Sequence, residues 1–248
     1  MNMYRNTMAA GGAAAVLLLA AGCETLDFSG AGNLVSGMLG ANGPQALSAD
    51  TIAAGLKEAL SVGTQNAVAQ AAKVGGYSAD PKLRIPLPAE LEGAAKTARK
   101  FGLGFYVDDL ESKMNLAAEQ AAGQAAPVFL DAVKQMTFED VKKIWAGGDT
   151  AATDYFRGKT SAQLAALCRP IVAKYTAQAG AAKAYHLFLD KYNAIPLVSK
   201  PQVPELESYV TGKAIAGLFE MLGREEAKIR TDPAARTTAL LRQVFGGK

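Results

Sequence analysis

One short segment gathers the hydroxyl and carboxylate side chains that suit the binding of an ion or a small charged molecule. It is Gly147-Gly-Asp-Thr-Ala-Ala-Thr-Asp-Tyr-Phe-Arg157. At a helix N-terminus, Asp149, Thr150 and Asp154 could hold a hard cation, or the free backbone amides could hold an anion. The spacing matches neither an EF-hand nor a phosphate-binding loop. In a structural alternative, the glycines end one helix and Asp149 or Thr150 caps the next. We retain Asp149, Thr150, Asp154 and Tyr155 as candidate ligand-binding residues.

A second candidate lies near the C-terminus, where Arg230 and Arg236 flank the start of an expected helix. Two guanidinium groups in such a place could grip a carboxylate or a phosphate. Alternatively, Asp232 caps that helix and the arginines pair with acidic residues of neighbouring helices. We retain Arg236 as a fifth candidate ligand-binding residue.

The residues that most often perform catalysis are scarce. His186 is the single histidine, and Cys168 would form a nucleophile pair with it if the two met in space. The apolar neighbours of Cys168 instead predict a buried, inert thiol. One histidine and one such cysteine nearly exclude a transition-metal site, which needs several nitrogen or sulfur ligands. We therefore assign no catalytic residue, no metal ligand and no cofactor.

Three pairs of acidic residues are adjacent in the sequence, and these are Asp108-Asp109, Glu139-Asp140 and Glu225-Glu226. Neighbouring side chains on a helix point about 100° apart, so the members of each pair do not converge as an acid and a base. We expect all three pairs to lie on solvated helix faces.

The N-terminus carries an export pattern. Arg5 precedes the uncharged residues Ala9–Ala21, which are too few to span a bilayer of about 30 Å but fit a signal peptide. They run into Leu19-Ala-Ala-Gly-Cys23, which resembles the lipobox of bacterial lipoproteins. The resemblance implies cleavage before Cys23, acylation of Cys23 and, with Glu24 in place of aspartate, placement in the outer membrane. Alternatively, an ordinary cleaved signal peptide leaves Cys23 as a thiol.

Three parts of the chain are expected: a signal peptide (1–22), a lipidated cysteine with a flexible glycine-rich tether (23–46) and a folded domain (47–248). In the whole chain 49 of 248 residues are alanine, which favours helix over sheet. The formal net charge is +3, and basic and acidic residues alternate along the chain, which argues against a nucleic-acid partner. We predict an all-α, compact single-domain bundle of about eight to ten helices.

Local patterns place several of these helices. Apolar residues recur every three or four positions from Ile52 to Val74, which predicts one helix capped by Ser48 or Asp50. Thr137 and Asp140 resemble a capping box for a helix over 138–146. Two prolines make Leu83–Pro88 an extended connector. Later helices are expected over 150–157, 160–178, 181–193, 205–230 and, with Asp232 as its cap, up to Phe245.

Five sequence motifs together resemble the bacterial family catalogued as domain of unknown function 4197. They are Ile52-Ala-Ala-Gly-Leu-Lys-Glu-Ala-Leu60, Arg84-Ile-Pro-Leu-Pro88, Lys134-Gln-Met-Thr-Phe138, Gly147-Gly-Asp-Thr-Ala-Ala-Thr-Asp-Tyr-Phe156 and Asp232-Pro-Ala-Ala-Arg-Thr-Thr238. The resemblance spans Leu47 to the C-terminus. It implies a helical, exported, often lipid-anchored protein of Gram-negative bacteria, and it supplies no activity or catalytic residue.

The leading functional hypothesis is an outer-membrane lipoprotein on the periplasmic face, acting as a non-enzymatic interaction or scaffold module. Its partners would be the membrane, through the lipid on Cys23, and an envelope protein. The alternative is a periplasmic binding protein for a lipid, an apolar molecule or a small anion held between helices, which a large apolar cavity would favour. A third hypothesis, a hydrolase, requires Asp149, Asp154, His186 and Arg236 to lie together.

Overall fold

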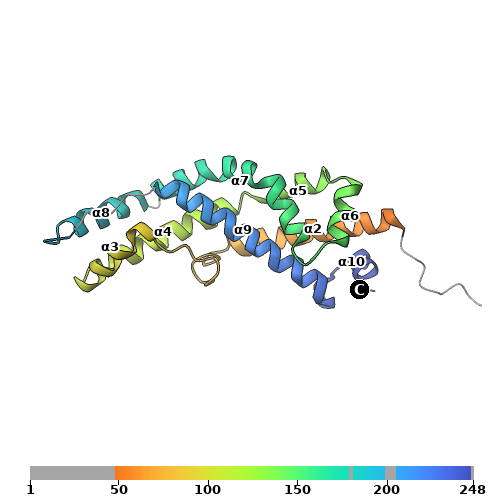
Figure 1. The fold of residues 1–248 in the computed structure, drawn as a ribbon, viewed down its shortest axis with the longest axis horizontal. Helices are drawn as coiled ribbons and strands as arrows, with labels where there is room; N and C mark the ends of the chain where they lie inside the picture. The colour runs from red at the N-terminus through yellow and green to blue at the C-terminus, as the bar shows by residue number, and fades with distance from the viewer. Residues whose placement is uncertain (1–47, 179–180, 199–204, 247–248) are drawn as a thin grey trace, which may run out of the picture. The chain divides into compact units, whose positions relative to one another are not determined.

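The computed structural model describes residues 48–178, 181–198 and 205–246, which belong to one compact unit, Leu47–Lys248 (Figure 1). Within them the secondary structure is helical throughout. The α-helices are α2 (Ala49–Ala72), α3 (Ala89–Lys100), α4 (Gly104–Ala122), α5 (Ala126–Lys134), α6 (Phe138–Ala146), α7 (Ala151–Gln178), α8 (Ala181–Asn193), α9 (Leu206–Thr231) and α10 (Ala239–Phe245). A 3-10 turn, η2 (Pro233–Ala235), precedes α10. The expected all-α bundle of eight to ten helices is confirmed. The expected signal peptide, Cys23 and the tether lie outside the described residues.

Helix α9 is the central element of the bundle. It packs most extensively against α7 and α2 and also contacts α4, so helices from both halves of the chain surround it (Figure 1). Helices α3 and α8 lie beside α4, whereas α6 and α10 lie beside α2. Two faces of α9 are therefore covered, one by α2 and the other by α7.

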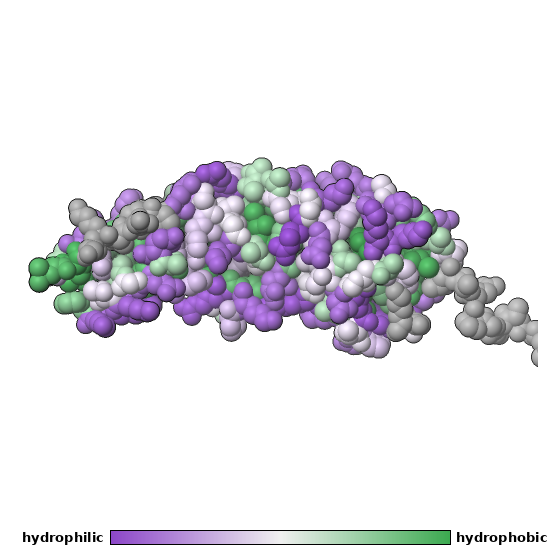
Figure 2. Space-filling view, viewed as in Figure 1, coloured by the Kyte–Doolittle hydropathy of each residue, from purple (hydrophilic) through white to green (hydrophobic). Residues whose placement is uncertain are grey.

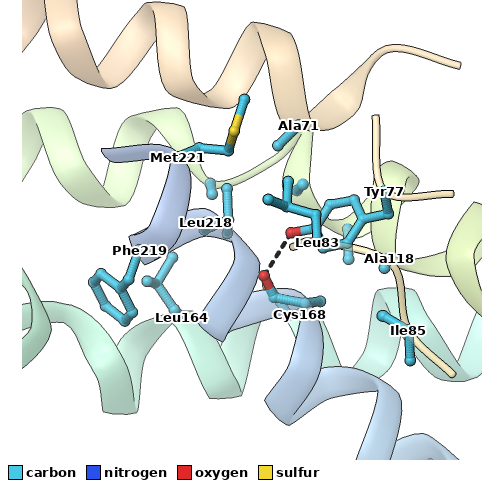
Figure 3. Packing of buried hydrophobic residues seen from close by; sticks show 14 of the residues in the cluster. Ala71, Tyr77, Leu83, Ile85, Ala118, Leu164, Cys168, Leu218, Phe219 and Met221 are labelled. Carbon is cyan, nitrogen blue, oxygen red and sulfur yellow. Dashed lines mark hydrogen bonds between the residues drawn. The ribbon is translucent and has the colours of Figure 1, made fainter. Parts of the chain in front are cut away.

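Small residues let the elements around α9 approach closely. Gly217 of α9 faces the ring of Tyr77, and a Cβ atom at position 217 would lie 2.5 Å from the Tyr77 ring. The Tyr77 hydroxyl donates to the carbonyl oxygen of Ala214 at 2.5 Å (Figure 3). Cys168 lies in the same buried cluster, as expected, and burial raises the pKa of its thiol to about 11. The core here has no room for an added methyl group.

Residues 84–88 of the predicted connector Leu83–Pro88 are extended and are held by side chains of α4, whereas Leu83 closes a turn from Asp80. Leu83, Ile85 and Leu87 are buried and alternate with exposed residues. The side-chain amide of Asn115 accepts from the Ile85 N–H and donates to the Ile85 carbonyl, both at 2.9 Å. Asn115 thus takes the place of a neighbouring strand for one residue of the connector.

Local capping signals predicted several helix ends correctly. The Ser48 hydroxyl accepts from the Thr51 N–H and caps α2. Thr137 and Asp140 form the complete capping box of α6, and Gly147 follows its last residue. These ends depend on residues within four positions of one another, so the sequence suffices to define them.

Three expectations about helix limits were wrong. The two helices expected over 150–157 and 160–178 form the single helix α7. Gly158 does not break it, because a buried stripe continues across it at four-residue spacing, through Phe156, Thr160, Leu164, Cys168 and Val172. One exposed glycine costs a helix only about 1 kcal/mol, which the packing of that stripe offsets. Helix α2 ends at Ala72, so Val74 does not continue its buried stripe and is 94% exposed.

The helix expected from Asp232 to Phe245 is divided. Asp232 does cap a turn, since its carboxylate accepts from the Ala234 N–H, but that turn is only η2. Helix α10 begins afresh with Thr238 as its cap. The Arg236 side chain turns back to the end of α9 and donates to the carbonyls of Ile229 and Arg230. That contact interrupts the helix, and local sequence patterns do not reveal it.

Candidate functional site

The N-terminus of α7, where the sequence suggested an anion site, is occupied by a side chain of this chain. The buried carboxylate of Glu226 on α9 accepts from the Ala152 N–H at 3.0 Å and from the Thr153 N–H at 2.9 Å. It also accepts from the Thr153 hydroxyl at 2.8 Å. The cap comes from a distant helix and not from Asp149 or Thr150. These two backbone amides are therefore not available to an external anion.

Arg230 completes this junction. Its guanidinium donates to Glu226 at 3.0 Å and to the Ile144 carbonyl at 3.2 Å, near the end of α6. One buried ion pair thus ties together the end of α6, the start of α7 and α9. Arg230 pairs with an acidic residue of its own helix, and the prediction of a partner on a neighbouring helix is therefore wrong.

The expectation that Glu225 and Glu226 lie on a solvated face was wrong, because both are buried. Their side chains do diverge: Glu226 reaches α7, and Glu225 accepts from Asn66 and Gln70 of α2 and pairs with Lys228. Since α9 is covered on two faces, adjacent residues with divergent directions are both buried. The sequence predicts that the two side chains point in different directions, but it does not predict that other helices cover both faces of α9.

An open groove between α7 and α9, of about 440 Å³, brings together three of the five candidate residues. Asp149, Thr150 and Asp154 line it, and the Thr150 hydroxyl donates to Asp154 at 3.0 Å. The guanidinium of Arg157, also lining the groove, lies 4.6 Å from the centre of the Phe219 ring. Arg157 forms no ion pair with another described residue, so its donors are open to a ligand. The groove has the groups for holding a small charged molecule and no activated nucleophile.

The other arginine of this groove is already engaged. Arg224 binds both carboxylate oxygens of Asp80 and also pairs with Glu220 at 3.1 Å. Its hydrogen bonds to Asp80 lower the pKa of that carboxyl group to about 2. Arg224 therefore ties α9 to the turn that contains Asp80. Because its charge is already paired, it contributes little free charge to the groove.

The remaining two candidates lie elsewhere. Tyr155 lines a separate polar depression of about 200 Å³ beside Thr137, Asp140 and Lys159. Burial, and secondarily the charge of Asp140, raises the pKa of its hydroxyl. Arg236 is buried at the end of α9 and lines neither depression. The five candidates thus form no single site.

The residues considered for catalysis do not share a cavity either. His186 is exposed on α8, whereas Cys168 is buried on α7 and its raised pKa keeps the thiol protonated at neutral pH. Asp149 and Asp154 line the α7–α9 groove, but Arg236 and His186 do not. Among the described residues no cluster of three or more histidine, cysteine, aspartate or glutamate side chains is arranged to hold a metal ion.

An apolar cavity at the edge of the core is small. It lies between α2, α9 and α10, is lined mainly by Leu56, Leu60, Ile229 and Phe245, and measures about 20 Å³. One water molecule needs about 10 to 15 Å³ on such a measure. This cavity has no space for a lipid or another apolar ligand.

A surface groove lined by apolar residues was not predicted from the sequence. It lies between the first turn of α2 and one face of α6, measures about 300 Å³, and is lined by Ala49, Ile52, Phe138, Val141, Lys142 and Trp145. Phe138, the first residue of α6, is 51% exposed. The spacing of Phe138, Val141 and Trp145 already placed three apolar residues near one helix face, but the contribution of α2 required the fold. We call this surface the α2–α6 groove.

Comparison with known proteins gives a family but no activity. In the described part of the chain no helix combines the length and the hydrophobicity needed to cross a bilayer. No curated protein and no solved structure shows significant similarity to the chain. The model of the family described as "Protein of unknown function (DUF4197)" matches residues 46–246, so the chain belongs to that family.

Proposed function

We propose that the protein is an outer-membrane lipoprotein, anchored on the periplasmic face through a lipid on Cys23, whose helical domain is a non-enzymatic module that binds an envelope protein. The anchor is supported by the lipobox-like sequence Leu19–Cys23 after the uncharged stretch Ala9–Ala21. Three acyl chains on one residue would hold the protein stably at the membrane, which a single chain does not.

The observation that carries the interaction role is the α2–α6 groove. Its lining is almost entirely apolar, and the ring of Phe138 is half exposed at its edge. Concave apolar surface of this kind is characteristic of sites that receive side chains from a partner. The depressions that contain carboxylates lack an assembled reaction centre, so binding accounts for the surface better than catalysis does.

The chemistry of the groove specifies its occupant. Ile52, Phe138 and Trp145 favour large apolar side chains, and Lys142 at the rim favours a carboxylate beside them. An amphipathic helix with apolar residues one turn apart and a flanking aspartate or glutamate meets both requirements. We assign this kind of segment, on an envelope protein, to the groove.

Photo-cross-linking in intact cells tests the assignment. A photoreactive phenylalanine analogue replaces Phe138 in one variant and Val74 in a control. Val74 is almost fully exposed. It lies beyond the end of α2 opposite the groove, and the 24 residues of α2 make a helix about 36 Å long. We expect a discrete cross-linked band from position 138 and none from position 74. No band at 138, or equal bands at both positions, would contradict the proposal.

The anchor has a separate test. In the Cys23→Ser variant the protein should lose incorporation of a labelled fatty acid and no longer fractionate with the outer membrane. Cys168→Ser is the matched control, and it should leave both properties unchanged, because Cys168 is buried in the core. Retention of the label in Cys23→Ser would contradict the proposed lipidation.

A second candidate function, the binding of a small anion, is favoured by Arg157. Its guanidinium bridges α7 and α9 over Phe219 while remaining without an ion-pair partner among the described residues. Native mass spectrometry of the protein purified from periplasm should then detect an added mass that is lost in Arg157→Gln. Arg169→Gln is the control, because Arg169 on the same helix is already paired with Glu205 at 2.7 Å. An unmodified mass in the parent protein would dismiss this candidate.

A further inference from the structure

The turn between α3 and α4 exposes two phenylalanines. Phe101 follows the last residue of α3 and is 60% exposed, and Phe105, in the first turn of α4, is 72% exposed. Between them Gly102 adopts a φ of +74°, which glycine accepts without strain. The turn therefore projects two aromatic rings from a backbone of fixed geometry. We call Phe101–Phe105 the aromatic turn.

The aromatic turn lies where packing does not cover it. The buried face of α4 is formed by Val107, Leu110 and Met114, and the two phenylalanines are not on that face. Helix α8 runs beside α3 and α4, and Figure 2 shows hydrophobic surface at the end of the domain where these helices lie in Figure 1. Exposure of two large aromatic side chains in one turn is costly for a surface that faces only water.

The charges around the aromatic turn are predominantly positive. Lys96 and Lys100 are exposed on the last two turns of α3, and neither forms an ion pair with a described residue. Two carboxylates of α4 close to the turn are engaged: Asp108 pairs with Arg99 at 2.7 Å, and Asp109 pairs with Lys113 at 2.7 Å. Two lysines thus remain without a partner beside the exposed rings.

We propose that the aromatic turn docks on a lipid bilayer that contains anionic lipid. Phe101 and Phe105 enter the boundary between headgroups and acyl chains, and Lys96 and Lys100 contact the headgroup phosphates. Aromatic rings flanked by long basic side chains match both layers of that boundary. A projecting turn suits a deformable lipid surface, whereas the α2–α6 groove suits a partner side chain. The inference goes beyond the proposed function and does not depend on the lipid at Cys23.

A reporter experiment on the full chain tests this docking. In a Cys23→Ser background, an environment-sensitive fluorophore is placed on Phe105→Cys or, as a control, on Val74→Cys. Cys168 remains in both chains, because it is buried and its thiol stays protonated. Vesicles contain phosphatidylcholine alone or with phosphatidylglycerol. Both chains share the same apolar N-terminal stretch, so any binding through that stretch affects them equally.

We expect a blue shift at position 105 with anionic vesicles, quenching by lipid-borne nitroxide, and no change at position 74. Removing one lysine, in Lys96→Gln or Lys100→Gln, should weaken vesicle binding about fivefold, the effect of about 1 kcal/mol per basic residue near an anionic surface. Phe101→Ser should weaken the response at 105, whereas Phe138→Ser, which alters an exposed phenylalanine outside the turn, should not.

Two results would overturn the inference. Identical responses at positions 105 and 74 would show that the turn does not enter the bilayer. A shift at 105 that depends on protein concentration without vesicles would show that a second copy of the chain covers the turn. Either result leaves the cross-linking test at Phe138 unaffected, so failure here and failure of the proposed function are distinguishable.

Discussion

The junction of α7 with α9 and the α2–α6 groove contrast sharply in chemistry and in availability. The junction contains carboxylates, hydroxyls and an arginine, and Glu226 and Arg230 of α9 bond to one another and to backbone groups of two other helices, α6 and α7. The groove contains almost no polar side chain, but its apolar surface is open. Glu226 and Arg230 therefore serve the fold. The α2–α6 groove leaves apolar surface accessible without a polar group to catalyse a reaction.

The strongest test of this comparison is the removal of the Glu226 carboxylate. Glu226→Ala should lower the free energy of unfolding by about 3 to 5 kcal/mol, because Arg230 and the Thr153 amide lose a buried partner. Asp149→Ala, on the exposed side of the same helix start, should change it by no more than about 0.5 kcal/mol. Urea unfolding measures both. Equal effects would mean that the junction is not structural.

The next largest loss of stability is expected where Asn115 holds the connector. Asn115→Ala leaves the buried N–H and carbonyl of Ile85 without partners and should cost about 2 to 4 kcal/mol. Asn193→Ala, at the exposed end of α8, should be near neutral. A near-neutral Asn115→Ala in urea unfolding would show that the connector needs no side-chain partner.

Two glycines of α9 give opposite expectations for one substitution. Gly217→Ala should destabilise the protein by about 1 to 3 kcal/mol, because the new methyl group meets the Tyr77 ring. Gly212→Ala has open space around it and should stabilise the helix by up to about 1 kcal/mol. Thermal unfolding of the two variants should shift in opposite directions. A shared direction would contradict the close packing at Tyr77.

Asp80 should give a smaller effect that depends on pH. Its folded-state pKa of about 2 lies below its unfolded value of about 3.9, so the ion pair with Arg224 stabilises the fold above about pH 4. That stability is lost as the pH falls toward 2. Asp80→Asn should cost about 1 kcal/mol at pH 7, and the difference from the parent should vanish below about pH 2. Urea midpoints measured at several pH values check the slope.

The smallest change in stability is expected in the groove. Phe138→Ser should alter the free energy of unfolding by no more than about 0.5 kcal/mol, since the ring is half exposed. With the photoreactive analogue placed at Ile52, the same substitution should remove the cross-linked partner. If stability fell together with cross-linking, Phe138 would be a structural residue, and the groove would not differ from the junction in the way described.

The sequence predicts the features of this fold that arise from neighbouring residues. The capping box at Thr137, the end of α6 at Gly147 and the extended connector all follow from spacings of a few positions. Continuity of α7 across Gly158 and the break at Arg236 were missed, because each depends on side chains packed from other parts of the fold.

For the candidate residues too, contacts between neighbours in the sequence were predictable and contacts between distant segments were not. Asp149, Thr150 and Asp154 do share one groove, because residues one helical turn apart lie on one face. The internal cap by Glu226 could not be predicted, since the two contacting segments are more than 70 positions apart. The α2–α6 groove likewise depends on helices that only the tertiary fold brings together.

The connector also affects how one molecule can associate with another. An extended segment with free backbone groups invites a strand of another molecule to pair with it, which is one route to aggregation. Here the N–H groups of Leu83 and Arg84 donate to the Asp80 carbonyl, and the N–H of Ile85 donates to Asn115. Pro86 and Pro88 carry no N–H at all. Of the six residues only Leu87 keeps a backbone donor for an incoming strand, so this segment is a poor template for intermolecular β-structure.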